Sequence, residues 1–506
     1  MDPEIADFAR SFRAFTKAMT RAAKADLSEL TPVGQHIQDF LGADLNEIEP
    51  VTETFPSHQV IDIDVALEAL VSELDGARYG ISGPDRAEVD TLTDYLTHTR
   101  AAFGIGPVAY ERQATGPESD RLVVAFGLGE VRVDNTPLVW LQRTAQPQYG
   151  RMEYTLEVIC SAATVAEAFL ARVRVLMAEH SVLRGQVISF VIDDFDYHDP
   201  GSKLTFLRRP EVRADQVILP AGVLDRVERH VVGIGKSRDA LRAAGQHLKR
   251  GVLLYGPPGT GKTHLVRHLL SETEGTTAVL LSGQTLGLLN EATTLARAVQ
   301  PAIVVLEDCD LVAQHRGAAG AALFNALEAM DGLAPDADIT FILTTNRADL
   351  LERALVERPG RVDLAVEIAK PDFEGRERLF RLYAAELLAS GQLTEAAVHT
   401  AAARTEGVTA SFTKELIRRC VINATLEGRA PNDADVSHAL DEMLSDAEAL
   451  TRTLLGGEGR SLAGPLGPDD DDDDDFVDDE DGDDEPDWEE HVRRRGPAGW
   501  VIRRGG

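Results

Sequence analysis

The stretch VLLYGPPGTGKTH at residues 252–264 constrains the fold of this 506-residue chain more than any other. Its first four residues are apolar and predict a buried strand, which the following glycines and prolines end. Glycines in such a loop let backbone N–H groups turn toward an anion, and the helix expected next directs its positive end to the same point. We therefore expect an α/β domain with a phosphate-binding loop at the carboxyl end of a strand.

The loop itself has the groups that hold a nucleoside triphosphate. Lys262 reaches the outer phosphates, and the Thr263 hydroxyl is suited to ligate magnesium. We therefore expect ATP and Mg²⁺ as cofactors. The predicted cofactor-binding residues of the loop are Gly256, Pro257, Pro258, Gly259, Thr260, Gly261, Lys262, Thr263 and His264.

A second apolar run, IVVLEDCD at residues 303–310, supplies acids at the same edge of the sheet. Most nucleotide hydrolases have Asp then Glu here, but this chain has the reverse order. The strand places Glu307 on the magnesium side and Asp308 where it orients or deprotonates water. Because aspartate is shorter by one methylene, roughly 1.5 Å, we expect real but slow hydrolysis. Asp310 is interpreted as a helix cap whose replacement has little effect.

Two later motifs complete the predicted site. The strand TFILTTNR ends at Asn346, which is placed to hydrogen-bond the attacking water or the terminal phosphate. The turn ERPGRVD presents Arg361, suited to stabilise charge on the transferred phosphoryl group across a subunit boundary. The expected catalytic residues are thus Asp308, Asn346 and Arg361. Together the motifs predict a Mg²⁺-dependent ATPase that converts ATP and water to ADP and phosphate.

Charge and composition limit the expected partners and compartment. The formal net charge is −33, and residues 469–490 alone hold 17 acidic side chains, so no nucleic-acid partner is expected. The three cysteines are far apart in sequence and predict neither a disulfide framework nor a zinc site. No apolar stretch is long enough to cross a bilayer. We expect a cytoplasmic protein without a transmembrane segment.

The pattern along the chain predicts five regions. Residues 1–105 are expected to be helical, and residues 106–210 to form an α+β recognition or assembly domain that includes the strand QVISFVIDD. At residues 211–372, alternating strands and helices predict a parallel sheet with helices on both faces. Residues 373–455 are expected to form a helical lid. Residues 456–506 are expected to be a disordered acidic tail with a basic end.

The phosphate loop, the VVLEDCD strand, TTN and RPGR occur in the order found in the AAA (AAA+) ATPases, which the chain resembles from about residue 211 to 450. The resemblance implies a homo-oligomeric ring, usually a hexamer, with ATP between subunits and Arg361 serving a neighbour. The Glu-Asp order and RPGRVD are most similar to the clade of the mitochondrial ATPase that translocates the folded Rieske iron–sulfur protein. By that similarity the backbone at Val217 and Ile218 meets adenine.

The chain also departs from the family pattern. Leu364 replaces a second arginine that many members have, and Phe412 stands where some relatives have a charged sensor. The segment SGQTLGLLNEATTL occupies the place of the pore loop without an aromatic side chain, which argues against threading of a polypeptide. No His-Glu-x-x-His motif occurs, so a metalloprotease of the AAA type is not expected.

These features support two functional hypotheses. The first is a ring ATPase that remodels or translocates an unknown protein client, which residues 1–210 engage. The alternative is an ATP-dependent assembly switch or scaffold with slow hydrolysis and no threading. A DNA-acting ATPase is disfavoured by the negative charge. The acidic tail is interpreted as a solubilising segment or as an autoinhibitory or partner-binding one.

Overall fold

The structure is a computed structural model of the chain. It describes residues 30–84, 91–97, 103–146, 149, 151–191, 203–310, 332, 334, 336–347 and 362–445. The predictions about Arg361 and about the acidic tail at 456–506 lie outside these residues. Within them, no helix combines the length and the apolar character that crossing a membrane requires.

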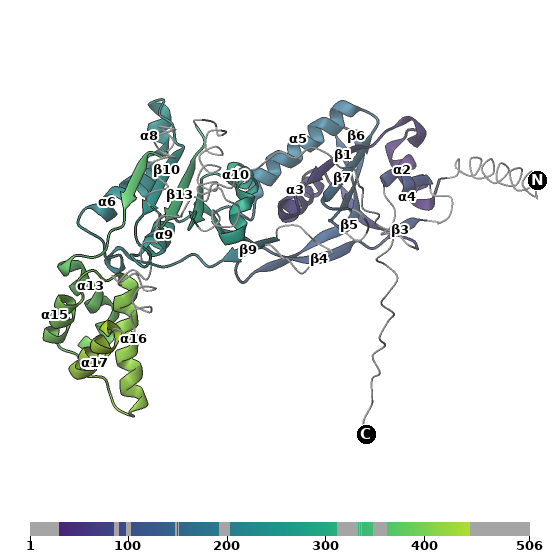
Figure 1. The fold of residues 1–506 in the computed structure, drawn as a ribbon. Coiled ribbons are helices and arrows are strands. Elements are labelled where there is room, and N and C mark those ends of the chain that lie inside the picture. The colour runs from purple at the N-terminus through teal and green to yellow at the C-terminus, as the bar shows by residue number, and fades with distance from the viewer. Residues whose placement is uncertain are drawn as a thin grey trace, which may run out of the picture. The chain divides into compact units, whose positions relative to one another are not determined.

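An antiparallel sheet organises the first part of the chain (Figure 1). Its strands follow the order β1-β7-β6-β5-β2-β3, and β4 pairs with a further stretch of β5. The strands are β1 Val51–Phe55, β2 Ala77–Ser82, β3 Gly104–Gly106, β4 Ala109–Ala114, β5 Asp120–Val133, β6 Thr136–Arg143 and β7 Tyr154–Cys160. Residues 1–105 were expected to be helical, but β1 and β2 lie within this range and β3 begins there, because short runs such as VTETF alternate between half-buried and exposed positions.

Helices cover both faces of this sheet. One apolar cluster joins the sheet to α3 and α5, and another joins it to α2 and α4. Trp140 lies in the first cluster directly opposite Gly129, where a Cβ atom would sit 2.0 Å from the indole ring, so the strand needs glycine there. The helices are α2 Pro32–Leu41, η1 Leu45–Glu47, η2 Ser57–Gln59, α3 Val60–Glu73, α4 Leu92–Thr97 and α5 Ala163–His180.

A second, seven-stranded sheet holds the phosphate loop. Its order is β14-β10-β13-β12-β11-β8-β9, and all neighbours are parallel except β8 and β9. Its strands are β8 Val187–Val191, β9 Lys203–Leu207, β10 Arg250–Tyr255, β11 Thr277–Ser282, β12 Ala302–Glu307, β13 Ile339–Thr345 and β14 Leu364–Glu367. Leu364, the departure noted above, pairs with Val252 and packs against the core.

Helices pack on both faces of the second sheet, as the sequence predicts. Apolar clusters place α6 and α9 on one face and α10 on the other, which explains why the central strands are almost continuously apolar. The helices of this part are η5 Ala214–Gln216, α6 Val223–Glu228, the π-helical turn η6 Arg229–Gly233, α7 Ile234–Lys236, α8 Arg238–Ala243, α9 Lys262–Ser271, η7 Gly283–Leu288 and α10 Leu289–Ala298.

The hairpin β8–β9 belongs to the second sheet, whereas the sequence pattern alone groups QVISFVIDD with the preceding α+β region. β8 pairs in parallel with β11 and so covers an edge that would otherwise expose unpaired backbone groups. The segment leading into β8 is fixed at both ends. The Val182 N–H donates to Asp62 Oδ1 at 2.9 Å, and the Gly185 N–H donates to Thr277 Oγ1 at 3.0 Å.

A helical lid follows the second sheet, as predicted. It comprises α13 Phe373–Tyr383, α14 Ala385–Ala389, α15 Glu395–Arg404, α16 Ala410–Leu426 and α17 Asp433–Leu444 around one apolar cluster. Side-chain caps define several starts: Asp372 accepts from the Gly375 N–H at 2.7 Å, and Asn432 accepts from the Ala434 N–H at 2.9 Å. Phe412 is fully buried in this cluster and is therefore a packing residue of the lid.

Candidate nucleotide site

The predicted strand, loop and helix are present in sequence order. β10 ends at Tyr255, and α9 begins at Lys262. Between them Gly256, Gly259 and Gly261 have φ values of 146°, 78° and 106°, a region that L side chains rarely adopt. A Cβ atom on Gly256 would also lie 2.4 Å from the Ile368 carbonyl oxygen. The loop therefore depends on glycine for its turn.

Lys262 lies inside this loop with 6% of its surface exposed. Its Nζ donates to the carbonyl oxygens of Gly256 and Pro257 at 2.8 and 2.9 Å, and to Asn346 Oδ1 at 2.8 Å. Burial lowers the pKa of Lys262, and the nearby carboxylates of Asp308 and Asp310 oppose that shift. The loop thus holds a cation whose present partners are neutral oxygens, which phosphate oxygens can replace.

Glu307 is the last residue of β12, and it lies beside Thr263, whose hydroxyl belongs to the first turn of α9. Burial raises the pKa of Glu307, whereas its hydrogen bond with Thr263 lowers it. A hydroxyl and a carboxylate are oxygen ligands of the kind Mg²⁺ prefers, and Mg²⁺ sites of this kind draw further ligands from the phosphates and from water. The pair therefore fits a magnesium ion that binds together with a nucleotide.

Asp308 leaves the strand in an unusual conformation. Its φ is 51°, in a region that aspartate tolerates better than most residues, and its N–H donates to Thr344 Oγ1 at 2.9 Å. Its Oδ1 accepts from Asn346 Nδ2 at 3.4 Å. Asp308, Lys262 and Asn346 line one cavity. The structure thus brings the predicted carboxylate, amide and ammonium groups together.

Asp310 has a contact that the sequence pattern did not predict. Its Oδ1 accepts hydrogen bonds from Thr345 Oγ1 at 2.9 Å and from the Asn346 N–H at 3.0 Å. The helix it was expected to cap lies outside the described residues. Asp310 therefore fixes the end of β13 and, through it, the position of Asn346. The sequence did contain a signal for this contact, because Asp310 follows β12 and Asn346 follows β13, and these neighbouring parallel strands end at the same edge of the sheet.

The lid closes over the loop and contributes side chains that sequence reasoning missed. The cavity has a volume of about 390 Å³, and its walls include Tyr383, Ser411 and Lys414 from the lid. The Ser411 N–H donates to the Gly259 carbonyl oxygen at 3.2 Å. Lys414 follows Phe412 by two positions in α16, so this helix places Lys414 in the wall of the cavity and Phe412 in the core of the lid. The lid lining of the cavity is completed by Ala410, and the loop side by Pro258, Gly259, Gly261, Thr263, His264 and Arg267.

The predicted adenine contacts lie beside the start of α9. His264 Nε2 lies 3.1 Å from the Gln216 carbonyl oxygen. The Val217 side chain is buried in the core, and its N–H donates to the Ala214 carbonyl oxygen at 3.1 Å. Ile218 lines a small cavity between the phosphate loop and the lid together with Thr260. The contact of residues 217 and 218 with adenine stays a prediction.

A parallel sheet with a glycine-rich phosphate loop, acids and an amide at one edge, and a helical lid over the loop defines a P-loop nucleotide-binding domain. Comparison with known proteins identifies its family. Residues 252–370 match the profile of the ATPase family associated with various cellular activities (AAA). This part of the chain is an AAA ATPase domain, as the order of the motifs predicts.

Two relatives illustrate the similarity. Over 247 residues the chain is 34% identical to the ATP-dependent zinc metalloprotease FtsH 2 of Symbiobacterium thermophilum. The matched segment makes up 46% of this chain and 40% of that protein. Over 225 residues it is 30% identical to the proteasome-activating nucleotidase of Sulfurisphaera tokodaii. This match covers 41% of the present chain and 56% of the nucleotidase. The chain thus spans about half the length of the curated relatives it matches. None of these matches bears on the Rieske-translocase clade, which stays a prediction.

Proposed function

We propose that the chain is a Mg²⁺-dependent ATPase that acts in the cytoplasm. It forms a homo-oligomeric ring, which we expect to be a hexamer, and it remodels or translocates a protein client. One observation supports hydrolysis above all. Lys262 Nζ lies 2.8 Å from Asn346 Oδ1, and Asn346 Nδ2 lies 3.4 Å from Asp308 Oδ1. The ammonium group of Lys262, which would bind phosphate, therefore lies close to the amide of Asn346 and the carboxylate of Asp308, which would position the attacking water.

Each side chain has a distinct part in the proposed reaction. Mg²⁺, when bound with ATP, neutralises phosphate charge. Thr263 and Glu307 would hold the ion, and Lys262 would exchange its carbonyl partners for phosphate oxygens. Asp308 orients and deprotonates the attacking water, while Asn346 fixes that water against the terminal phosphate. Arg361 of a neighbouring subunit is proposed to stabilise charge on the transferred group.

Relatives and domain order support a protein client. The matched relatives are named as a metalloprotease that depends on ATP and as a nucleotidase that activates the proteasome. In this chain the AAA domain follows an antiparallel sheet with helices on both faces. We assign this preceding region, residues 30–180, to client or cofactor recognition, and we expect no nucleic-acid partner.

The test is steady-state ATP turnover of the full chain with Mg²⁺. Lys262→Ala should abolish turnover by preventing productive phosphate binding. Asp308→Asn should slow turnover by at least about a hundredfold while ATP still binds, since removal of a general base typically costs 10²–10⁴-fold. Asp239→Asn is the control, because this carboxylate is 94% exposed on α8. Wild-type turnover no higher than that of Lys262→Ala would refute the proposal.

The assembly switch remains the second candidate, on one specific observation. The connection from β11 to α10 is a short 3₁₀ helix, Gly283–Leu288, with Gln284 exposed and no aromatic side chain. Such a segment offers no aromatic group to grip an extended polypeptide. Light scattering with ATP or ADP, and turnover with and without unfolded casein, separate the two candidates. Stimulation by casein counts against the switch, whereas ATP-dependent assembly without stimulation favours it.

A further inference from the structure

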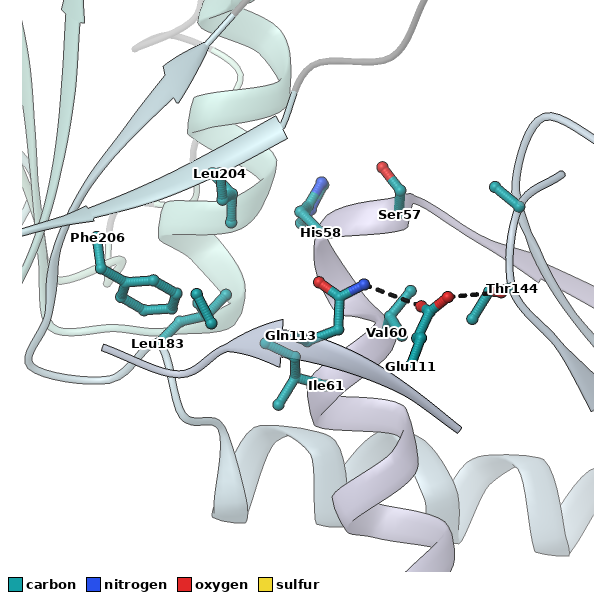
Figure 2. A pocket seen from close by; sticks show the side chains of 12 residues that line it. Ser57, His58, Val60, Ile61, Glu111, Gln113, Thr144, Leu183, Leu204 and Phe206 are labelled. Atoms are coloured by element: carbon teal, nitrogen blue, oxygen red, sulfur yellow. Dashed lines mark hydrogen bonds between the residues drawn. The ribbon is translucent and has the colours of Figure 1, made fainter. Parts of the chain in front are cut away.

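A second cavity, which shares no lining residue with the nucleotide cavity, lies between the start of α3, strand β4 and strand β9. Its volume is about 260 Å³. Figure 2 shows polar side chains, Glu111, Gln113 and Thr144, on one side and apolar ones, Leu204 and Phe206, on the other. The cavity thus has two chemically different walls, as a site for an amphipathic group requires.

Glu111 is the acidic side chain of the polar wall. Its Oε1 accepts from Gln113 Nε2 at 2.9 Å, and its Oε2 accepts from Thr144 Oγ1 at 3.3 Å. Among the described residues no arginine, lysine or histidine forms an ion pair with it, although nearby buried acids do have such partners, for example Asp64 with Arg78. Two neutral donors therefore orient this carboxylate and leave its charge uncompensated.

His58 borders the same cavity without adding positive charge. Burial lowers the pKa of His58 to about 4, so the ring is neutral near pH 7. Its Nε2 is buried and has no hydrogen-bond partner, and the ring meets Phe190 edge-on with 6.4 Å between the centroids. A neutral His58 leaves Glu111 as the charged side chain of the cavity lining.

We propose that this cavity binds an aliphatic cation, the side chain of an arginine or lysine in an extended polypeptide. The cationic head contacts Glu111, and the aliphatic stem lies along Leu204 and Phe206. An extended polypeptide suits the place, because β4 and β9 each pair with a single described strand and so leave a backbone edge open. The proposal is independent of ATP hydrolysis.

Calorimetric titration of the full chain tests the charge requirement with two matched pairs of probes. The first pair is n-butylguanidinium and its neutral isostere n-butylurea. The second is acetyl-Val-Arg-Val-amide and the same peptide with citrulline in place of arginine. Each cation should bind at least about tenfold more tightly than its neutral isostere, a difference of about 1.4 kcal/mol. A peptide that binds more tightly than n-butylguanidinium supports a polypeptide ligand, whereas equal affinity supports the cation site but overturns the assignment of a polypeptide as its ligand.

Variants locate the binding. Glu111→Gln keeps an oxygen acceptor for its neighbours but removes the charge, and it should weaken both cations at least about tenfold, again about 1.4 kcal/mol. Glu167→Gln is the matched control, because it removes an equal charge from an exposed glutamate of α5 that forms no ion pair among the described residues. Ala145→Leu fills the cavity without changing charge and should also abolish binding. The proposal is overturned if cations and isosteres bind equally, if no probe binds, or if both glutamate variants behave like wild type.

Discussion

Replacement of Asp310 by alanine is the sharpest test of how the hydrolytic site is positioned. The change removes the acceptor of two hydrogen bonds, from Thr345 Oγ1 at 2.9 Å and from the Asn346 N–H at 3.0 Å. A hydrogen bond to a charged group contributes about 1.5–3 kcal/mol. Because Asp310 is half-buried and water can replace part of these contacts, we expect a loss of about 2–3 kcal/mol in the free energy of unfolding.

The same variant should reduce turnover more than it reduces nucleotide binding. Asn346 is held from two sides, since Asp310 accepts from its backbone N–H while Lys262 donates to its side-chain oxygen. Without the first contact the amide is free to move, and a misplacement of about 1 Å can cost about a hundredfold in rate. We therefore expect a fall in kcat of roughly ten- to a hundredfold with little change in the affinity for ATP.

Urea denaturation and steady-state turnover measure these two effects. Asp310→Asn keeps an acceptor but loses the charge, so it should fall between wild type and Asp310→Ala in both assays. Asp239→Asn, on the exposed surface of α8, controls for the loss of one negative charge. Wild-type turnover and stability in Asp310→Ala would refute the positioning role and support the simple cap that the sequence suggested.

Three further predictions test other parts of the chain. Gly259→Ala should weaken ATP binding, measured by fluorescent-nucleotide displacement, by about tenfold, because φ is 78° and a Cβ would lie within 3.0 Å of lid hydroxyls, at a cost of about 1–2 kcal/mol for the conformation alone. Lys414→Met should raise KM for ATP several-fold and leave adenosine affinity unchanged, because it removes a cation from the wall of the phosphate cavity. His58 has a folded pKa of about 4 against 6.5 for an unfolded histidine, so its contribution to stability is complete above pH 6.5 and is lost as the pH falls toward 4. His58→Gln should remove about 3 kcal/mol of this change in the free energy of unfolding, measured by urea denaturation between pH 4 and 6.5. An equal change with pH in wild type and variant would contradict the prediction.

The core of the site could be predicted from sequence because its groups follow strand ends. Parallel strands have their carboxyl ends at one edge, so residues after β10, β12 and β13 converge without any knowledge of the rest of the fold. Lys262, Asp308 and Asn346 indeed line one cavity. The glycine positions of the loop are local signals too, since they report the backbone conformation directly.

Contacts decided by tertiary packing were out of reach. Lys414 faces the nucleotide cavity and Phe412 faces the lid core, a choice set by how α16 packs on α13 and α17. The pairing of β8 with β11 depends on which sheet edge is open, and no local pattern in QVISFVIDD records that. The role of Asp310 depends on Thr345 and Asn346 at the end of β13, which lie 35 and 36 residues further along the chain.

The reversed Glu307–Asp308 order fits the local backbone. Glu307 is still within β12, where its longer side chain reaches the Thr263 hydroxyl. Asp308 is the first residue beyond the strand, and its φ of 51° costs about 1–2 kcal/mol for most L residues. The hydrogen bond from its N–H to Thr344 Oγ1 fixes that turn and directs the short carboxylate toward Asn346. The backbone turn thus compensates for part of the missing methylene, yet at 3.4 Å the contact remains long for a hydrogen bond. Slow hydrolysis therefore stays a prediction, which steady-state turnover of the full chain tests.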